Sequence, residues 1–351
     1  MKTGSGHQRL ALLDVYRGLA IVAVMLFHYT ARLPDDYLGF QDPPPAFGPG
    51  HLGVQAFFAI SGFCIYLTLS RSSGLSDFFA KRFARLWPAL ILCALLTQLV
   101  VSAAGLPGRE IGWSQWPGSL LMLNDFGVPW VDGAYWSLLV EIKYYLLFAL
   151  TYHLVRERVL AWLVCLSAVS VLGVLAARRL ALPGLERMLE TMLIPAHLPW
   201  FLLGVAFYAV FAGTGTARGV VAAIATVIAS LLPHGEAALE KTGVLLLVVI
   251  GLVALLRYPG LRVPALLRYP GLISFPLYLL HQNIGYVTIR ELGPLLPHSG
   301  GRILAAAIVA LALAHIVHVG VEFRYRRRFE DGFLHLSSRL DKHARRLLGF
   351  S

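Results

Sequence analysis

The sequence predicts an all-α polytopic membrane protein, a bundle of about ten transmembrane helices with both termini in the cytoplasm. Of its 351 residues, 57% are hydrophobic and only 14% are charged. A soluble domain carries about 25% charged residues. Apolar stretches of about 20 residues, the length that crosses a bilayer as a helix, recur along the chain. Lysines and arginines gather in alternate connecting segments, as the positive-inside rule requires.

The apolar stretches are separated by short segments rich in proline and glycine, such as residues 43–45 and 105–108. These residues interrupt helices and favour turns. We therefore expect ten spans, at about residues 10–30, 51–70, 87–104, 134–155, 158–177, 192–211, 217–233, 242–257, 269–290 and 302–321.

Positive charge sets the expected orientation. An N-terminus in the cytoplasm places most of the 30 lysines and arginines on that side. The expected domains are a membrane domain over residues 1–323 and a basic cytoplasmic tail over residues 324–351. We expect the tail to lie on the anionic inner leaflet, although its FRYRRRF segment could instead contact a cofactor phosphate. Topology accounts for the net charge of +11, so no nucleic-acid partner is expected.

The cysteines give no sign of a disulfide or metal framework. Cys64, Cys93 and Cys165 all lie in apolar stretches. None belongs to a Cys-x-x-Cys pair or to a Cys/His spacing typical of zinc sites. We therefore expect no metal centre.

The first apolar stretch is interrupted by Asp14, Arg17 and His28. At about 100° per residue Arg17 and His28 share one helical face, roughly 16 Å apart along the axis. Ionisable groups are costly at membrane depth and usually mark a functional interior. An alternative is that Asp14 and Arg17 form a structural pair one turn apart, but this leaves His28 without a reason.

A second polar group follows the second span. Arg82 and Arg85 are three residues apart and share a face if this segment is helical. Two adjacent guanidinium groups bind phosphate or pyrophosphate well. The alternative is an ordinary positive-inside flank.

The fourth span carries a carboxylate, Glu141, about 10 Å from its outer end. Lys143 faces another side of that helix, so it does not pair with Glu141 within the span. A carboxylate at this depth needs a partner, and the candidates are His28 and Arg17. A Glu–His contact would orient the imidazole and raise its basicity, as in general-base sites.

Five segments together resemble the acyltransferase type 3 family of integral-membrane O-acyltransferases. The resemblance extends over most of the chain, and the segments occur in the order typical of the family. They are LLDVYRGLAIVAVMLFH, HLGVQAFFAISGF, KRFARLWP, YWSLLVEIKYYLL and ISFPLYLLH.

This resemblance implies transfer of an acyl group, usually acetyl, from acyl-CoA to a hydroxyl acceptor. Expected acceptors are a glycan, a glycolipid or a macrolide, and the expected location is a bacterial inner membrane. His28 is then the essential catalytic residue, Arg17 supports it, and Arg82 and Arg85 contact acyl-CoA. His28 acts either as a general base or as a transient acyl carrier.

Two other classes of function are the alternatives to an enzyme. A secondary transporter or flippase would also have intramembrane charges and many spans, but the chain shows no internal repeat of the kind common in transporters. A purely structural membrane protein leaves the face of Arg17 and His28 unexplained.

Overall fold

The computed structural model describes residues 10–33, 35–155, 158–231, 237–325 and 328–335. Over these residues the chain is helical and contains no strand, which confirms the all-α class. The chain divides into two compact units. The first comprises Met1–Ala31, Ala46–Tyr66 and Val155–Ser274, and the second comprises Arg32–Pro45, Leu67–Leu154 and Phe275–Ser351.

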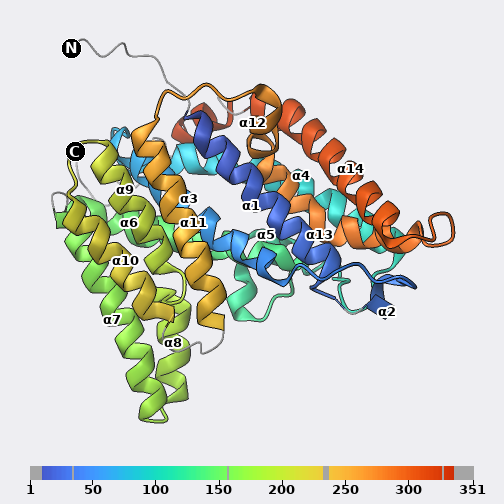
Figure 1. The fold of residues 1–351 in the computed structure, drawn as a ribbon, viewed down its shortest axis with the longest axis horizontal. Coiled ribbons are helices and arrows are strands. Elements are labelled where there is room, and N and C mark those ends of the chain that lie inside the picture. Colours follow the sequence, from blue (N-terminus) through green and yellow to red (C-terminus); the bar gives the residue numbers. More distant parts are fainter. Residues whose placement is uncertain (1–9, 34, 156–157, 232–236, 326–327, 336–351) are drawn as a thin grey trace, which may run out of the picture. The chain divides into compact units, whose positions relative to one another are not determined.

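The first unit contains the helix of Arg17 and His28 (Figure 1). Its elements are α1 (Ala11–Thr30), the 3₁₀ turn η1 (Gly48–Leu52), α3 (Gly53–Ser70, whose end belongs to the second unit), α7 (Val159–Arg179), α8 (Pro183–Leu193), α9 (Leu198–Phe211), α10 (Ala217–Leu231), α11 (Ala237–Arg257) and α12 (Ala265–Leu272).

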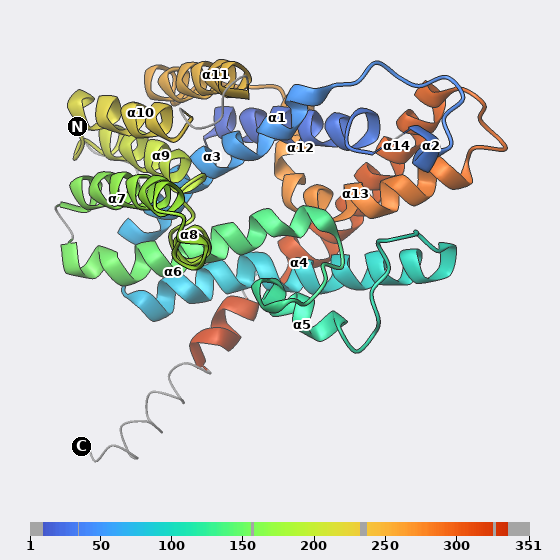
Figure 2. The ribbon, with the colours of Figure 1, turned by 90° about the horizontal axis from the view of Figure 1, so that it is seen from below.

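Helix α9 forms the core of this unit, since every side chain from Leu198 to Ala209 is buried. It packs against α7 and α10, and the three helices lie side by side in Figure 2. It also crosses α3 at very short range. A Cβ built on Gly204 would collide with the carbonyl oxygen of Ala59, and one on Gly62 would collide with that of Phe201. Small residues of this kind let membrane helices approach backbone to backbone.

Helix α1 packs against α12 and against η1. Its contact with α12 depends on Gly18 and Gly271, because a Cβ on Gly18 would lie 3.1 Å from the backbone nitrogen of Gly271. A Cβ on Gly271 would collide with the carbonyl oxygen of Asp14. This close approach fixes the start of α1 and brings Asp14 to α12.

The second unit contains the helices of Arg82 and Glu141. Its elements are α2 (Asp35–Leu38), α4 (Leu75–Ala104), α5 (Trp116–Leu120), the 3₁₀ turns η2 (Leu123–Phe126) and η3 (Gly133–Tyr135), α6 (Trp136–Val155), α13 (Ser274–Glu291), α14 (Ser299–Val317) and the π-helical turn η6 (His318–Phe323). Helix α4 packs against α5, α14 and η6.

Seven helical segments of the described residues are long and apolar enough to cross a membrane. They are Ala11–Thr30, Gly48–Ser70, Leu75–Ala104, Val159–Arg179, Pro183–Phe211, Leu239–Arg257 and Ser299–Phe323. Each of the ten expected spans contains a helix, but α6, α10 and α13 are not among the seven. The count of ten and the cytoplasmic termini therefore stay predictions. Of the expected basic tail, residues 326–327 and 336–351 lie outside the described residues.

Helix boundaries differ from the expected spans in two informative places. The span expected from residue 87 begins at Leu75, because the basic segment before Pro88 continues the same helix. The span expected at residues 192–211 is divided, because Ile194 adopts a left-handed conformation with φ of 44° and ends α8. An isoleucine is an unusual residue for that conformation. Pro195, the next residue, disfavours the α-helical conformation of Ile194 and so agrees with the end of α8.

The crossing of α3 and α9 leads to a stability prediction. Gly204→Ala should lower the free energy of unfolding by about 1–3 kcal/mol, because an added methyl forces the two backbones apart. Gly243→Ala on α11 is the matched control, since a Cβ there meets nothing within 4 Å. Thermal unfolding of the detergent-solubilised variants measures both. Equal melting temperatures for the two variants would contradict the close approach.

Candidate functional site

His28 lies in the last turn of α1 and is 8% exposed. Its Nδ1 atom is 2.9 Å from the carbonyl oxygen of Val24, one turn earlier in the same helix. A carbonyl oxygen can only accept a hydrogen bond, so Nδ1 carries the proton in this arrangement. In the neutral ring the basic lone pair is then on Nε2. The helix itself thus selects the tautomer of His28.

A second imidazole lies near His28 in the first unit. The ring of Phe27 is 5.1 Å from that of His28 and 5.5 Å from that of His51, between ring centroids. His51 belongs to η1, and its Nδ1 lies 2.8 Å from the carbonyl oxygen of Gly48. No spacing in the sequence pointed to His51, because the packing of η1 on α1 creates this neighbourhood.

The charged residues at the start of α1 lie far from His28 along the helix. Asp14 is buried, and its Oδ2 is 3.7 Å from Nε of Arg268 on α12. Arg17 lies on the same uninterrupted helix, so roughly 16 Å of helix axis separates it from His28. Asp14 therefore has a structural partner outside α1. The role of Arg17 as a residue that supports His28 stays a prediction.

In the second unit Arg82 is buried on α4 and well oriented. Its guanidinium hydrogen-bonds to Oγ1 of Thr68. The guanidinium carbon lies 5.9 Å from the ring centre of Phe78 and 5.6 Å from that of Tyr145. Contacts of this kind stabilise a desolvated cation. Arg85, one turn later, is only partly buried.

Tyr145 links the arginines to Glu141. Its hydroxyl donates a hydrogen bond of 2.6 Å to Oε1 of Glu141, one turn earlier on α6. The charges of Arg82 and Arg85 also act on the Tyr145 phenol. The structure thus brings three of the predicted site residues around a tyrosine that sequence reasoning missed. The only signal was its position four residues after Glu141.

Lys143 turns away from Glu141, as expected from the helical period. Its Nζ forms an ion pair of 2.5 Å with Oδ2 of Asp125 in η2. His281 on α13 is fully buried, and its Nδ1 lies 2.9 Å from the carbonyl oxygen of Tyr278. This is the hydrogen-bonding role common for a histidine within a helical bundle.

A buried carboxylate in the segment before α6 holds the second unit together. The side chain of Asp132 accepts hydrogen bonds from the backbone N–H groups of Ala134, at 2.8 Å, and Asn283, at 2.9 Å. Burial raises the pKa of Asp132 to about 6, while these two bonds and the charge of Arg109 oppose the rise. Asp132 thus ties the start of α6 to α13.

Within the described ranges, no three histidine, cysteine, aspartate or glutamate side chains gather closely enough to hold a metal ion. The predicted site residues described above provide an imidazole in the first unit, and paired guanidinium groups with a carboxylate and a phenol in the second. Such groups suit proton transfer and the binding of an anionic ligand.

Comparisons with known proteins agree with this chemistry. A family model described as an acyltransferase domain matches residues 10–318. An O-acetyl transferase of Shigella phage Sf6 is 34% identical over 116 residues, covering 32% of this chain and 28% of that protein. Acyltransferase MdmB of Streptomyces mycarofaciens is 28% identical over 189 residues, covering 48% of this chain and 49% of that protein. The chain thus matches half or less of each curated relative's length. No solved structure matches the chain.

The buried Asp132 predicts a pH dependence of stability. Its folded pKa of about 6 lies above the ordinary value of 3.8, so its contribution to stability is present at low pH and is lost as the pH rises through about 4 to 6. The loss amounts to roughly 3 kcal/mol. Asp132→Asn should remove this contribution to the dependence of the unfolding free energy on pH, whatever the variant's stability at a single pH. Unfolding measured from pH 4 to pH 7 in both proteins tests this, and identical slopes would contradict it.

Proposed function

Since the chain belongs to the acyltransferase type 3 family, we propose that it is an integral-membrane enzyme that moves a short acyl group from acyl-CoA to a hydroxyl group. The acyl group is acetyl and the acceptor is a cell-surface or secreted glycan. The enzyme itself lies in a bacterial inner membrane. The similarity to an O-acetyl transferase supports the acetyl group and the oxygen acceptor. The seven apolar helices support the membrane location.

The observation that carries this proposal is the geometry of His28. Its Nδ1 atom is committed to the Val24 carbonyl, so Nε2 is the basic nitrogen of the neutral ring. As a general base, Nε2 takes the proton of the acceptor hydroxyl while the oxygen attacks the thioester carbon. The new C–O bond forms, the C–S bond breaks, and the CoA sulfur leaves as a thiolate that takes up the proton.

A second route uses the same atom. Nε2 attacks the thioester carbon and carries the acyl group until the acceptor oxygen displaces it. In both routes one proton leaves the hydroxyl and one thiol is released. The carbonyl of Val24 serves both, because it keeps the ring oriented and stabilises the positive charge that develops on the imidazole.

We assign binding of the donor's phosphates to Arg82 and Arg85. Arg82 is held by Thr68 and two aromatic rings, so its guanidinium is already desolvated and oriented. Arg85 is the more exposed of the two and presents the more accessible charge. Glu141 stays a proposed catalytic carboxylate, and its bond to Tyr145 fixes the direction of that carboxylate. Arg17 is proposed to support His28 by stabilising either the oxyanion that develops in the reaction or the carboxylate network.

His28→Ala should lower acyl transfer by about 10²–10⁴-fold, because it removes the base while leaving the helix intact. The assay is release of free thiol from acetyl-CoA in the presence of a bacterial glycan extract, which also separates an enzyme from a transporter. His315→Ala is the control, since His315 is an exposed histidine of α14. Substantial transfer by a normally expressed His28→Ala protein would remove His28 from the mechanism.

Arg85→Gln should raise the KM for acetyl-CoA by about 10–100-fold and change kcat little, because one charge-assisted contact to phosphate is lost. Arg71→Gln is the matched control, since Arg71 is an exposed arginine just before α4. If both variants raise the KM equally, the arginines act as a general positive flank and the donor site lies elsewhere.

A further inference from the structure

A histidine–glutamate pair lies at the end of α14 in the second unit, apart from the groups assigned above. Nδ1 of His318 is 2.6 Å from Oε2 of Glu322, one turn later in η6. When the ring is protonated, the two groups form an ion pair. An ionised carboxylate only accepts hydrogen bonds, so Nδ1 carries a proton and Nε2 is the nitrogen that can face a reactant. A carboxylate that orients an imidazole in this way is common in acid–base sites.

The backbone that carries this pair is unusual. Residues His318–Phe323 form a π-helical turn, whereas α14 before them is a regular α-helix. Turns of this kind are rare in proteins and occur frequently at functional sites. The position of the pair on such a turn therefore points to a function rather than to packing alone.

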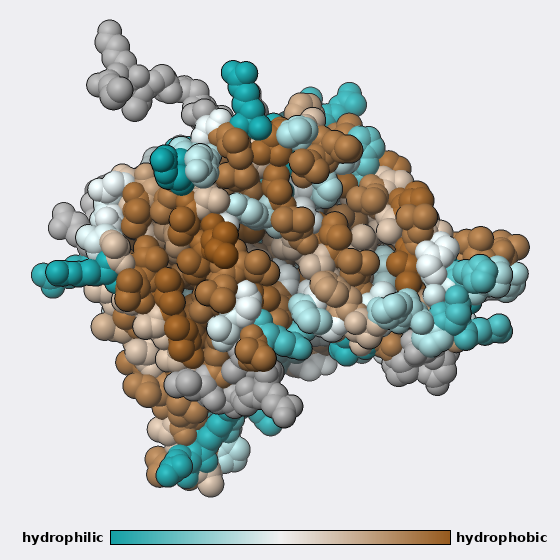
Figure 3. Space-filling model, viewed as in Figure 1, coloured by the Kyte–Doolittle hydropathy of each residue, from teal (hydrophilic) through white to brown (hydrophobic). Residues whose placement is uncertain are grey.

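The pair lies on the inner side of its helix. His318 and Glu322 continue a row of buried alanines that are four residues apart. They are Ala306, Ala310 and Ala314. The opposite side of α14 exposes apolar residues such as Leu304 and Ile308, and Figure 3 shows hydrophobic surface along this helix. The segment Ser299–Phe323 is long and apolar enough to cross a membrane. Ionisable groups on the inner side of such a segment usually mark a functional interior. The side chain of His318 stays 24% exposed, so a small group can reach it.

The pair also lies beside α4, the helix of the two arginines assigned to the donor. The turn η6 packs against α4, and the charge of Glu322 acts on the thiol of Cys93. Cys93 shares a face of α4 with Arg82, because their spacing is about three helical turns. Along the axis Cys93 lies about 12 Å beyond Arg85. The level of the pair along α4 is therefore known relative to the arginines.

The length of the donor matches this separation. The arm of CoA between its pyrophosphate and its sulfur is as long as about four extended amino-acid residues, or about 14 Å. A donor whose phosphates lie at Arg82 and Arg85, and whose arm runs along α4 into the membrane domain, has its sulfur near the level of Cys93. This is the level at which η6 packs on α4. The match of the two lengths connects the pair to the leaving group of the reaction.

We propose that His318 is a catalytic acid that protonates the sulfur of CoA as it leaves, and that Glu322 is the positioning residue that holds its ring. This inference rests on the proposed function and adds a residue to it. The C–S bond breaks, its electron pair goes to the sulfur, and the sulfur takes the proton from Nε2 of His318. His318 then regains a proton from water, while His28 releases to water the proton that it took from the hydroxyl, so each turnover is balanced. The acyl-histidine route uses the same acid, because it releases the same thiol.

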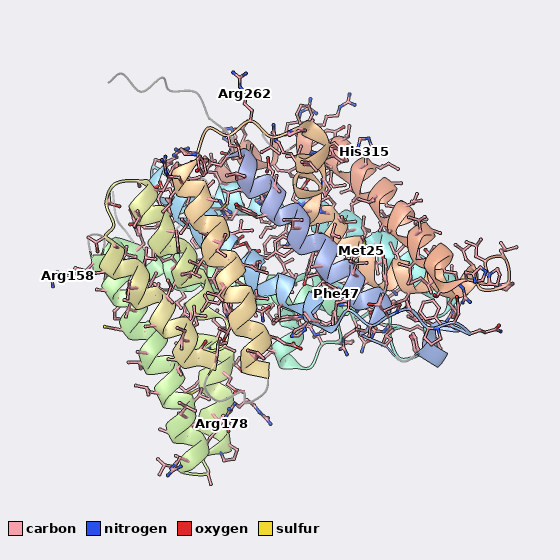
Figure 4. All side chains as sticks on the ribbon, viewed as in Figure 1. Met25, Phe47, Arg158, Arg178, Arg262 and His315 are labelled. Carbon is pink, nitrogen blue, oxygen red and sulfur yellow. The ribbon has the colours of Figure 1, made fainter. Side chains whose placement is uncertain are left out.

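Two acyl donors separate this role from a structural one. A weakly basic thiolate leaves readily without an acid, so acetyl-thionitrobenzoate, an aryl thioester, is compared with acetyl-CoA in the full chain with a bacterial glycan extract. His318→Ala should lower kcat with acetyl-CoA by about 10²-fold and change kcat with the aryl thioester by about twofold or less. Glu322→Gln should show the same selectivity with a loss of about tenfold. His315→Ala is the matched control and should change neither, since His315, labelled in Figure 4, is an exposed histidine of the same helix.

Equal losses with both donors in His318→Ala would show that the pair only supports the fold, and an unchanged kcat with acetyl-CoA would show that it has no part in the reaction. Either result overturns the proposal. If the wild-type protein does not use the aryl thioester, added imidazole decides. It should raise the acetyl-CoA turnover of His318→Ala by about tenfold, and absence of this rescue would refute the acid role. His28→Ala should lose transfer from both donors. Failure at His318 thus leaves the proposed acyl transfer standing, whereas retained transfer in His28→Ala contradicts the function itself.

Discussion

An ionisable side chain within a membrane domain must have a polar partner, and most of the site geometry follows from this constraint. The partners are local. Nδ1 of His28 donates a hydrogen bond to the carbonyl of Val24, and Glu141 accepts one from the hydroxyl of Tyr145. Each partner is one helical turn away. Because a helix places residues i and i+4 on one face, each of these groups has a hydrogen-bond partner within its own helix.

The same constraint separates structural from chemical groups. Asp14 is paired with Arg268 on α12, where glycines bring the two backbones together, so its charge serves the packing of α1. Asp132 is hydrogen-bonded by two backbone N–H groups and ties α6 to α13. His28 differs from both, because a backbone carbonyl holds its Nδ1 atom, which makes Nε2 the basic nitrogen of the neutral ring. A backbone hydrogen bond that fixes the tautomer of a histidine leaves its other ring nitrogen as the base.

The sequence predicted the features that depend on the length of apolar stretches and on the helical period. The all-α class, the helix shared by Arg17 and His28 and the adjacent turns of Arg82 and Arg85 all follow from apolar length and the 3.6-residue period. Tyr145 was missed because a tyrosine one turn from a glutamate in an apolar helix resembles any core aromatic. His51 and Arg268 could not be found at all, since their neighbours depend on how η1 and α12 pack on α1.

The groups are divided between the two units in a way that suits a reaction with two substrates. The first unit holds the imidazole of His28, and the second holds the guanidinium groups, the phenol and the carboxylate. A water-soluble donor with several phosphates is best bound by oriented arginines such as Arg82. On the proposed function, the base that takes the acceptor's proton belongs to the first unit and the arginines that bind the donor's phosphates belong to the second.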